Sequence, residues 1–142
     1  MKKIQHSKKI IEVVPRIMDL IRTQIRSYAR DELTIPQFRV LNKLSRSPLT
    51  HKEVADWMGI TPATLTRIVD SLVMRQLATR KTNPQDRRQI YLAPTAAGKR
   101  LARHYLDQTD QWFEARIASL SVQDQRRLQE GLTILDDLFL DI

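Results

Sequence analysis

The sequence contains no cysteine, only three glycines and only three histidines among 142 residues. Without thiols the chain cannot form disulfides, thiolate zinc sites or thiol redox sensors. So few glycines leave no glycine-rich phosphate-binding loop, and His6, His51 and His104 are scattered over different predicted elements. Because no nucleophile stands at a suitable spacing from a base, we expect a protein that is not an enzyme and that uses no cofactor or metal.

Long apolar runs are also missing. Nowhere do about 18 apolar residues follow one another, so no membrane span is expected. The N-terminal segment carries lysines, but Glu12 and Pro15 interrupt the apolar run that a signal peptide would need. A cytoplasmic protein is the simplest interpretation.

Positive charge is what the chain has in excess. Its 24 Lys and Arg residues outnumber 16 Asp and Glu residues, and 42% of all residues are hydrophobic, enough for an ordinary core. The length predicts a single domain over residues 1–142. The charge is uneven, since residues 75–104 hold eight Lys or Arg and one acidic residue, whereas residues 105–142 hold three Arg and eight acidic residues. A concentrated basic segment favours an anionic partner such as nucleic acid.

Residues 50–72 predict a helix-turn-helix. Thr50 and Glu53 form the pattern of a capping box at the start of its first helix. Gly59 lies where the turn requires a left-handed backbone, and Thr61 caps the second helix, with Pro62 at its first position. Apolar residues at helical spacing are predicted to face inward: Val54, Ala55, Met58, Ile60, Leu65, Ile68, Val69 and Leu72.

The other side chains of the second helix are predicted to point outward, and most are short and polar. A single arginine, Arg67, suits a helix inserted into the major groove, where arginine pairs with guanine and threonine contacts thymine methyl groups or phosphates. The alternative is a solvated helix face in a module that binds protein, and the basic surroundings favour DNA. The candidate DNA contacts of this helix are Thr61, Pro62, Ala63, Thr64, Thr66, Arg67 and Ser71, with Asp70 on the same outward face.

Two short strands are predicted next, over residues 77–81 and 89–93, with a turn-rich loop between them. Asn83-Pro84 marks the turn. Ile90 and Leu92 alternate with Gln89 and Tyr91, which indicates a strand with one buried face. The pair would form a wing beside the helix-turn-helix.

Amphipathic helices are predicted on both sides of this unit. The first spans about residues 7–30, where Pro15 favours either a kink or a later start. A second follows Thr34, whose capping box is completed three residues later. The last two helices are capped by Thr95 and Ser121. Their apolar stripes exceed what one small domain would bury, which favours pairing with a second subunit; the first stripe is also explained by intrachain core.

These features make the sequence similar to the MarR/SlyA family of bacterial winged-helix transcription regulators. The similarity covers essentially the whole chain and rests above all on Asp86-Arg87-Arg88, followed by Thr95 and Gly98. It implies a mainly α-helical subunit of the α+β winged-helix class, with six helices and a two-stranded β wing.

The resemblance also divides the chain by role. About residues 34–93 would form the DNA-binding winged helix-turn-helix, and about residues 7–30 and 95–142 the dimerisation helices. Proteins of this family are typically homodimers that bind pseudo-palindromic double-stranded DNA as repressors, and many are released by small aromatic or phenolic ligands. The side chains that would line such an effector cleft are explained equally well as core or solvated residues, so no ligand site is assigned.

By the same resemblance, the wing supplies the remaining DNA contacts. Arg88 corresponds to the arginine that enters the minor groove, with Asp86 holding it in place and Arg87 as the less certain neighbour. A narrow A·T minor groove attracts such a guanidinium because it concentrates negative potential. Arg80 and Lys81 of the first wing strand complete the predicted set.

The sequence departs from the family at Pro94, which replaces the usual leucine, so the second wing strand is expected to stop one residue early. A helical dimer whose winged domain acts as a protein-protein adaptor for an acidic partner is the alternative function.

Overall fold

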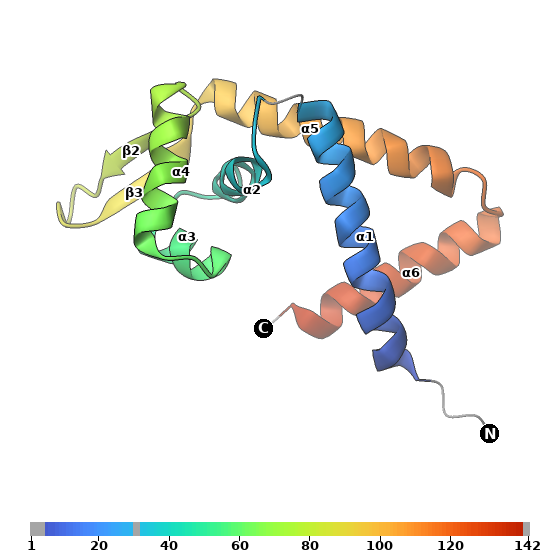
Figure 1. Ribbon diagram of the computed structural model, residues 1–142. Coiled ribbons are helices and arrows are strands. Elements are labelled where there is room, and N and C mark those ends of the chain that lie inside the picture. The colour runs from blue at the N-terminus through green and yellow to red at the C-terminus, as the bar shows by residue number, and fades with distance from the viewer. Residues whose placement is uncertain (1–4, 30–31, 141–142) are drawn as a thin grey trace. The chain divides into compact units, whose positions relative to one another are not determined.

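The computed structural model describes residues 5–29 and 32–140 (Figure 1). Among them are three strands, β1 (Leu49–Thr50), β2 (Ala78–Thr82) and β3 (Ile90–Pro94). The predicted class, mainly α-helical with six helices and a β wing, is confirmed. Arg30, Asp141 and Ile142, which fall at predicted helix ends, lie outside the described residues. The helices are α1 (His6–Ala29), α2 (Ile35–Leu44), α3 (His51–Met58), α4 (Pro62–Met74), α5 (Ala96–Ile117) and α6 (Val122–Phe139).

The chain divides into two compact units, residues 1–107 and 108–142. The first unit holds α1 to α4, the sheet and the beginning of α5, and the second holds the end of α5 and all of α6. The assignment of residues 34–93 to DNA binding and of the flanking helices to dimerisation stays a prediction. Within the part of the chain that the structure describes, no helix is long and apolar enough to cross a membrane.

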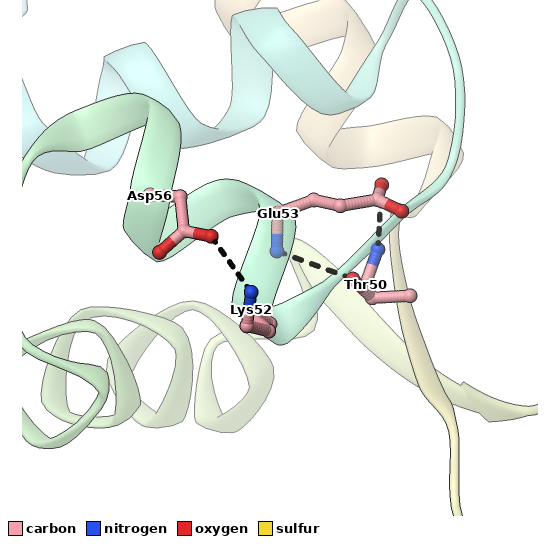
Figure 2. A network of polar contacts seen from close by, with 4 residues as sticks. All are labelled: Thr50, Lys52, Glu53 and Asp56. Carbon is pink, nitrogen blue, oxygen red and sulfur yellow. Dashed lines mark hydrogen bonds and ion pairs between the residues drawn. The ribbon is translucent and has the colours of Figure 1, made fainter.

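Both predicted capping boxes are confirmed. At the start of α3, the Thr50 side chain accepts a hydrogen bond from the Glu53 N–H (3.2 Å), and the Glu53 carboxylate accepts one from the Thr50 N–H (3.3 Å) (Figure 2). One turn later, Lys52 Nζ lies 3.2 Å from Asp56 Oδ2 (Figure 2). The capping box thus satisfies two backbone N–H groups that have no partner within the helix. The same pattern joins Thr34 and Gln37 at the start of α2.

The turn between α3 and α4 also follows the prediction. Gly59 ends α3 with a left-handed backbone (φ 66°), which glycine adopts without steric cost. Thr61 then caps α4 by accepting a hydrogen bond from the Thr64 N–H (3.2 Å). The inward residues of the two helices join one core with α2, β3 and α5, whose most fully buried side chains are Tyr105, Leu41, Leu44, Leu65, Leu72, Leu92, Val40, Val54 and Val69.

The sheet has one strand more than predicted. Its order is β1-β3-β2 with antiparallel neighbours, so β3 is central. Thr50 pairs with Tyr91, which means that the residue that caps α3 also belongs to the sheet. The predicted alternation in β3 is wrong at its first residue, because Ile90 is exposed while Leu92 is fully buried.

Pro94 does not shorten β3 as expected. The strand runs through Pro94, which is in register with Ala78 of β2. Because β1 pairs only with Tyr91 and Leu92, the sheet beside Pro94 has a neighbour on one side alone. A residue without an N–H donor is tolerated in a strand that is unpaired on one side.

Gly98, in the first turn of α5, packs against the turn that joins α4 to β2. A Cβ atom at this position would lie 2.0 Å from the carbonyl oxygen of Leu77. Thr95, which caps α5 as predicted, fixes the same approach: its N–H donates to the Leu77 carbonyl (3.0 Å) and its hydroxyl to the Gln76 carbonyl (2.7 Å). Gln76 itself has a left-handed backbone (φ 58°).

Tyr105 of α5 is buried and donates a hydrogen bond to the carboxylate of Glu32. Burial raises the pKa of Tyr105 far above its ordinary value, and the hydrogen bond to Glu32 and the negative charge of Glu32 raise it further, against a smaller lowering by Arg75. The hydroxyl therefore stays protonated in the folded chain.

α1 is one uninterrupted helix with Pro15 inside it, so the helix does not begin at Pro15. Ile25 and Ala29 near its C-terminal end are buried. Further toward the N-terminus its large apolar side chains are exposed or half-buried. The exposed ones are Ile11, Val14, Ile17, Met18 and Leu20.

In the second unit, Ser121 caps α6 by accepting a hydrogen bond from the Asp124 N–H (3.1 Å), as predicted. Trp112 and Phe113 near the end of α5 pack edge to face, with ring centroids 5.0 Å apart. α6 has no buried residue within its described length. Its exposed large apolar side chains are Val122, Leu128, Leu132, Ile134, Leu138 and Phe139.

Candidate nucleic-acid interface

The outward face of α4 is polar and open to solvent. Thr61, which caps the helix, and the residues that follow it present short side chains, and Arg67 adds the one positive charge of this helix. Short side chains let a helix approach base edges closely, and the N-terminal residues of a recognition helix are the ones that reach them. Six of the seven predicted contacts in this helix are exposed: Thr61, Pro62, Ala63, Thr64, Thr66 and Arg67.

Ser71 departs from the prediction that it points outward. It is half-buried, and its hydroxyl accepts a hydrogen bond from Gln37 Nε2 (3.0 Å). Gln37 is the same residue that completes the capping box of α2, so it holds the start of α2 against the second half of α4. The partner lies 34 positions away in the sequence and could not be deduced from local pattern.

Thr66 is held by two neighbours. Its hydroxyl lies 2.9 Å from the Pro62 carbonyl oxygen, one turn back in α4, and 3.2 Å from Nε2 of His51 at the start of α3. His51 is thus a hydrogen-bonding neighbour of α4. Among the described residues, no group of three or more histidine or acidic side chains could hold a metal ion.

β2 and β3 form a hairpin that projects beyond α4 (Figure 1). Its loop is closed by the Asn83 N–H, which donates to the Gln89 carbonyl (3.0 Å). At the tip, the Asp86 carboxylate accepts a hydrogen bond from the Arg88 N–H (3.0 Å). Asp86 thus holds the backbone of Arg88, and the residues Arg87 and Arg88 are both exposed.

Arg80, predicted as a DNA contact, forms an ion pair with Asp70 of α4. The pair joins the first wing strand to the recognition helix, and both side chains remain partly exposed. An exposed pair of this kind stabilises a fold by well under about 1 kcal/mol, so its effect is chiefly to orient the two groups. Lys81, the next residue, is exposed.

A cleft of about 560 Å³ lies between the helix-turn-helix and the base of the wing. It brings Pro62 of α4 and Arg88 of the wing to one surface, together with the first residues of α3. His51 and Lys52 were not predicted as site residues. Their position directly after the Thr50 cap, at the N-terminal end of a helix-turn-helix, is the signal that could have indicated them. The full lining is Thr50, His51, Lys52, Ala55, Asp56, Pro62, Arg88, Gln89 and Ile90.

The fold and this surface define a winged helix-turn-helix protein. Residues 33–90 match the model of the MarR family, and the winged helix-turn-helix of this chain belongs to that family. An uncharacterized HTH-type transcriptional regulator of Bacillus subtilis (strain 168), YpoP, is 26% identical over 122 residues, which are 85% of this chain and 86% of the relative. By these comparisons the chain is similar to transcriptional regulators rather than to enzymes.

Solved structures show the same fold. Wild-type MarR from E. coli, in its apo form, superposes with a TM-score of 0.76 at 21% sequence identity, covering 95% of this chain and 98% of that one. Streptococcus pneumoniae FabT, solved in complex with DNA, superposes with a TM-score of 0.74 at 21% identity, over 95% of this chain and 98% of that chain.

Proposed function

We propose that the protein is a homodimeric repressor that binds double-stranded DNA at a pseudo-palindromic operator. One observation carries the proposal: the start of α4 and the arginine of the wing tip border the same cleft, through Pro62 and Arg88. A single approach to a duplex would thus bring α4 to the major groove and the wing to the adjacent minor groove. FabT, which has this fold, was solved in complex with DNA, which supports DNA as the partner of this chain.

The major-groove part of the proposal rests on the exposed face of α4. Arg67 can form two hydrogen bonds to O6 and N7 of guanine, which is the commonest specific contact in the major groove. The short residues around it, Ala63 and Thr64, leave room for the helix to enter the groove. Arg67 and the threonines would therefore determine the DNA sequence specificity, while lysines and arginines at the edge of the cleft would bind phosphates.

The minor-groove part rests on the wing. Asp86 fixes the backbone of Arg88 at the tip of the hairpin, so less backbone freedom is lost when the guanidinium enters a groove. The preferred operator would contain A·T-rich segments at the positions that face the wings, because a narrow minor groove has the strongest negative potential.

Dimerisation rests on the exposed apolar residues of α1 and α6. Exposed Ile17 and Met18 on α1, and Leu132 and Phe139 on α6, are the kind of surface that a soluble chain covers with a partner. A two-fold dimer would set the recognition helices about 34 Å apart, one turn of DNA, which predicts an inverted repeat. The helical residues 7–30 and 95–142 would form this interface and residues 34–93 the DNA-binding part.

Release by a small aromatic or phenolic effector completes the proposal. A second cleft, of about 400 Å³, lies where α1 meets the start of α2 and is lined by Arg26, Leu33, Thr34, Ile35 and Pro36. Its apolar side chains and one guanidinium suit an aromatic carboxylate. If it is the effector site, benzoate at millimolar concentration should weaken DNA binding by the wild type and not by Arg26→Ala.

The test is selection of bound duplexes from a random DNA library, followed by titration of the enriched duplex at several salt concentrations. The wild type should enrich an inverted repeat, and affinity should fall steeply with salt. Arg88→Ala should weaken binding about tenfold or more, whereas Arg126→Ala, an equal charge change on α6, should not. If no inverted repeat is enriched, the repressor function is refuted and the adaptor alternative gains support.

A further inference from the structure

We infer that Thr66 recognises thymine through its methyl group, because its contacts with Pro62 and His51 use the only proton of its hydroxyl. The inference rests on the proposed function and adds to it a specificity-determining residue and the chemical group that it recognises. His51, which lies on α3, becomes a positioning residue for a side chain on α4.

The hydrogen-bonding capacity of Thr66 is limited. A threonine hydroxyl has one proton to donate and two lone pairs to accept with. The Pro62 carbonyl oxygen carries no proton, so the 2.9 Å contact is one that the Thr66 hydroxyl donates. Nε2 of His51, 3.2 Å away, must then be the donor of the second contact. The ring nitrogen therefore carries a proton and the hydroxyl accepts from it.

With its proton used inside the helix, the Thr66 hydroxyl cannot donate to a base. The acceptors in the major groove are N7 and O6 of guanine, N7 of adenine and O4 of thymine, and all of them need a donor. Thr66 still presents its methyl group, and one lone pair that can only accept from N6 of adenine or N4 of cytosine. The apolar partner in the major groove is the C5-methyl group of thymine. At a thymine, whose O4 needs a donor that Thr66 lacks, contact would be between the two methyl groups, so Thr66 would favour thymine over deoxyuridine.

Thr64 provides a matched comparison on the same exposed face. Its hydroxyl lies 2.8 Å from the hydroxyl of Thr61, and either of the two can donate. When Thr61 donates, Thr64 keeps a proton for a base or a phosphate. Thr64 and Thr66 are the same residue type, but only the hydroxyl of Thr64 can donate a hydrogen bond to DNA.

The experiment uses the operator selected from random DNA and replaces each thymine of a half-site in turn by deoxyuridine, which removes only the methyl group. At one position the wild type should lose about fourfold in affinity, the factor expected for burial of one methyl-sized group. Thr66→Val keeps the methyl and should show the same loss. Thr66→Ser keeps the hydroxyl and should not distinguish thymine from deoxyuridine at that position.

A second variant tests His51. His51→Ala should reduce the discrimination between thymine and deoxyuridine at that position, because the threonine can then turn, and it should change nothing further in the Thr66→Val background. Thr64→Val should leave the discrimination unaltered. All variants are first compared with the wild type by circular dichroism and thermal unfolding, so that a folding defect is recognised before binding is measured.

The outcomes distinguish failure of the inference about Thr66 from failure of the proposed function. An operator that the wild type binds, but at which Thr66→Val loses the discrimination or Thr66→Ser retains it, overturns the inference and leaves the proposed function standing. A wild type that is insensitive to every deoxyuridine overturns it too. A selection that enriches no duplex overturns the proposed function and the inference together.

Discussion

Replacing Gly98 with alanine would place a methyl group in the backbone of the turn between α4 and β2. The new Cβ atom would lie 2.0 Å from the Leu77 carbonyl oxygen, 2.9 Å from its carbonyl carbon and 3.2 Å from Leu41 Cδ2. Two of these atoms belong to backbone that Thr95 holds by hydrogen bonds, so they cannot move independently. Relief would require α5 to separate from the turn by more than an ångström, at the expense of the packing around Leu41.

The magnitude can be bounded. In an unconstrained helix, alanine is favoured over glycine by about 1 kcal/mol, whereas forcing a methyl group into a packed site costs about 1–3 kcal/mol and sometimes more. Because the overlap here is with backbone, we expect the unfavourable effect to dominate and Gly98→Ala to destabilise the protein by about 3 kcal/mol. Urea unfolding followed by circular dichroism measures the change.

Gly131→Ala in α6 is the matched control, since a Cβ there meets nothing within 4 Å. This variant should be neutral or stabilise the chain by up to about 1 kcal/mol. Both variants are compared at one protein concentration, because the stability of the proposed homodimer would depend on concentration. A Gly98→Ala protein as stable as the wild type would refute the argument from close approach.

Three further predictions address capping, pH and salt. Thr61→Ala should destabilise the protein by about 1 kcal/mol, because α4 loses its cap, and Thr61→Ser should restore most of it; equal unfolding midpoints would contradict this. Stability should fall as the pH rises above about 10, the ordinary tyrosine pKa, because Tyr105 ionises in the unfolded chain while its raised pKa keeps it protonated when folded. Tyr105→Phe should reduce that fall, measured as urea midpoints between pH 8 and 11. Lys52→Gln should reduce the slope of log affinity against log salt by about one unit; an unchanged slope would exclude a phosphate contact.

Much of the fold could be predicted because its signals are local. The caps Thr34, Thr50 and Thr61 act on backbone groups three residues away, and the left-handed turn at Gly59 depends on one residue. The residues that form such contacts lie within about one helical turn of each other in the sequence, so their types and spacing predict the contact. The boundaries of the helix-turn-helix therefore followed from residue type and spacing.

The features that were missed depend on partners far along the chain. β1 has only two residues, and it exists because Thr50 meets Tyr91. Ser71 is half-buried because Gln37 reaches it across the helix pair. The exposure of Ile90 and the tolerance of Pro94 both depend on where β1 ends, which no local pattern reports.

In the candidate site, too, local features could be predicted and contacts between distant residues could not. The exposed face of α4 and the basic wing followed from helical spacing and charge, whereas the pairing of Arg80 with Asp70 and of His51 with Thr66 required three-dimensional proximity. In both cases a residue that the sequence presents as free has its polar group engaged by a neighbour. The sequence thus predicts which residues lie on the surface better than it predicts which of their polar groups remain free to bind DNA.

The pairing of Thr50 with Tyr91 has a mechanical consequence. Thr50 is at once the cap of α3 and a member of the sheet, so the first helix of the helix-turn-helix and the base of the wing are one continuous hydrogen-bonded piece. Beyond Tyr91, toward the loop, β3 pairs only with β2, and the last pair is Thr82 with Ile90. Adjustment to DNA grooves of different width would then occur in the loop that carries Arg88. The spacing between α4 and the base of the wing would stay constant.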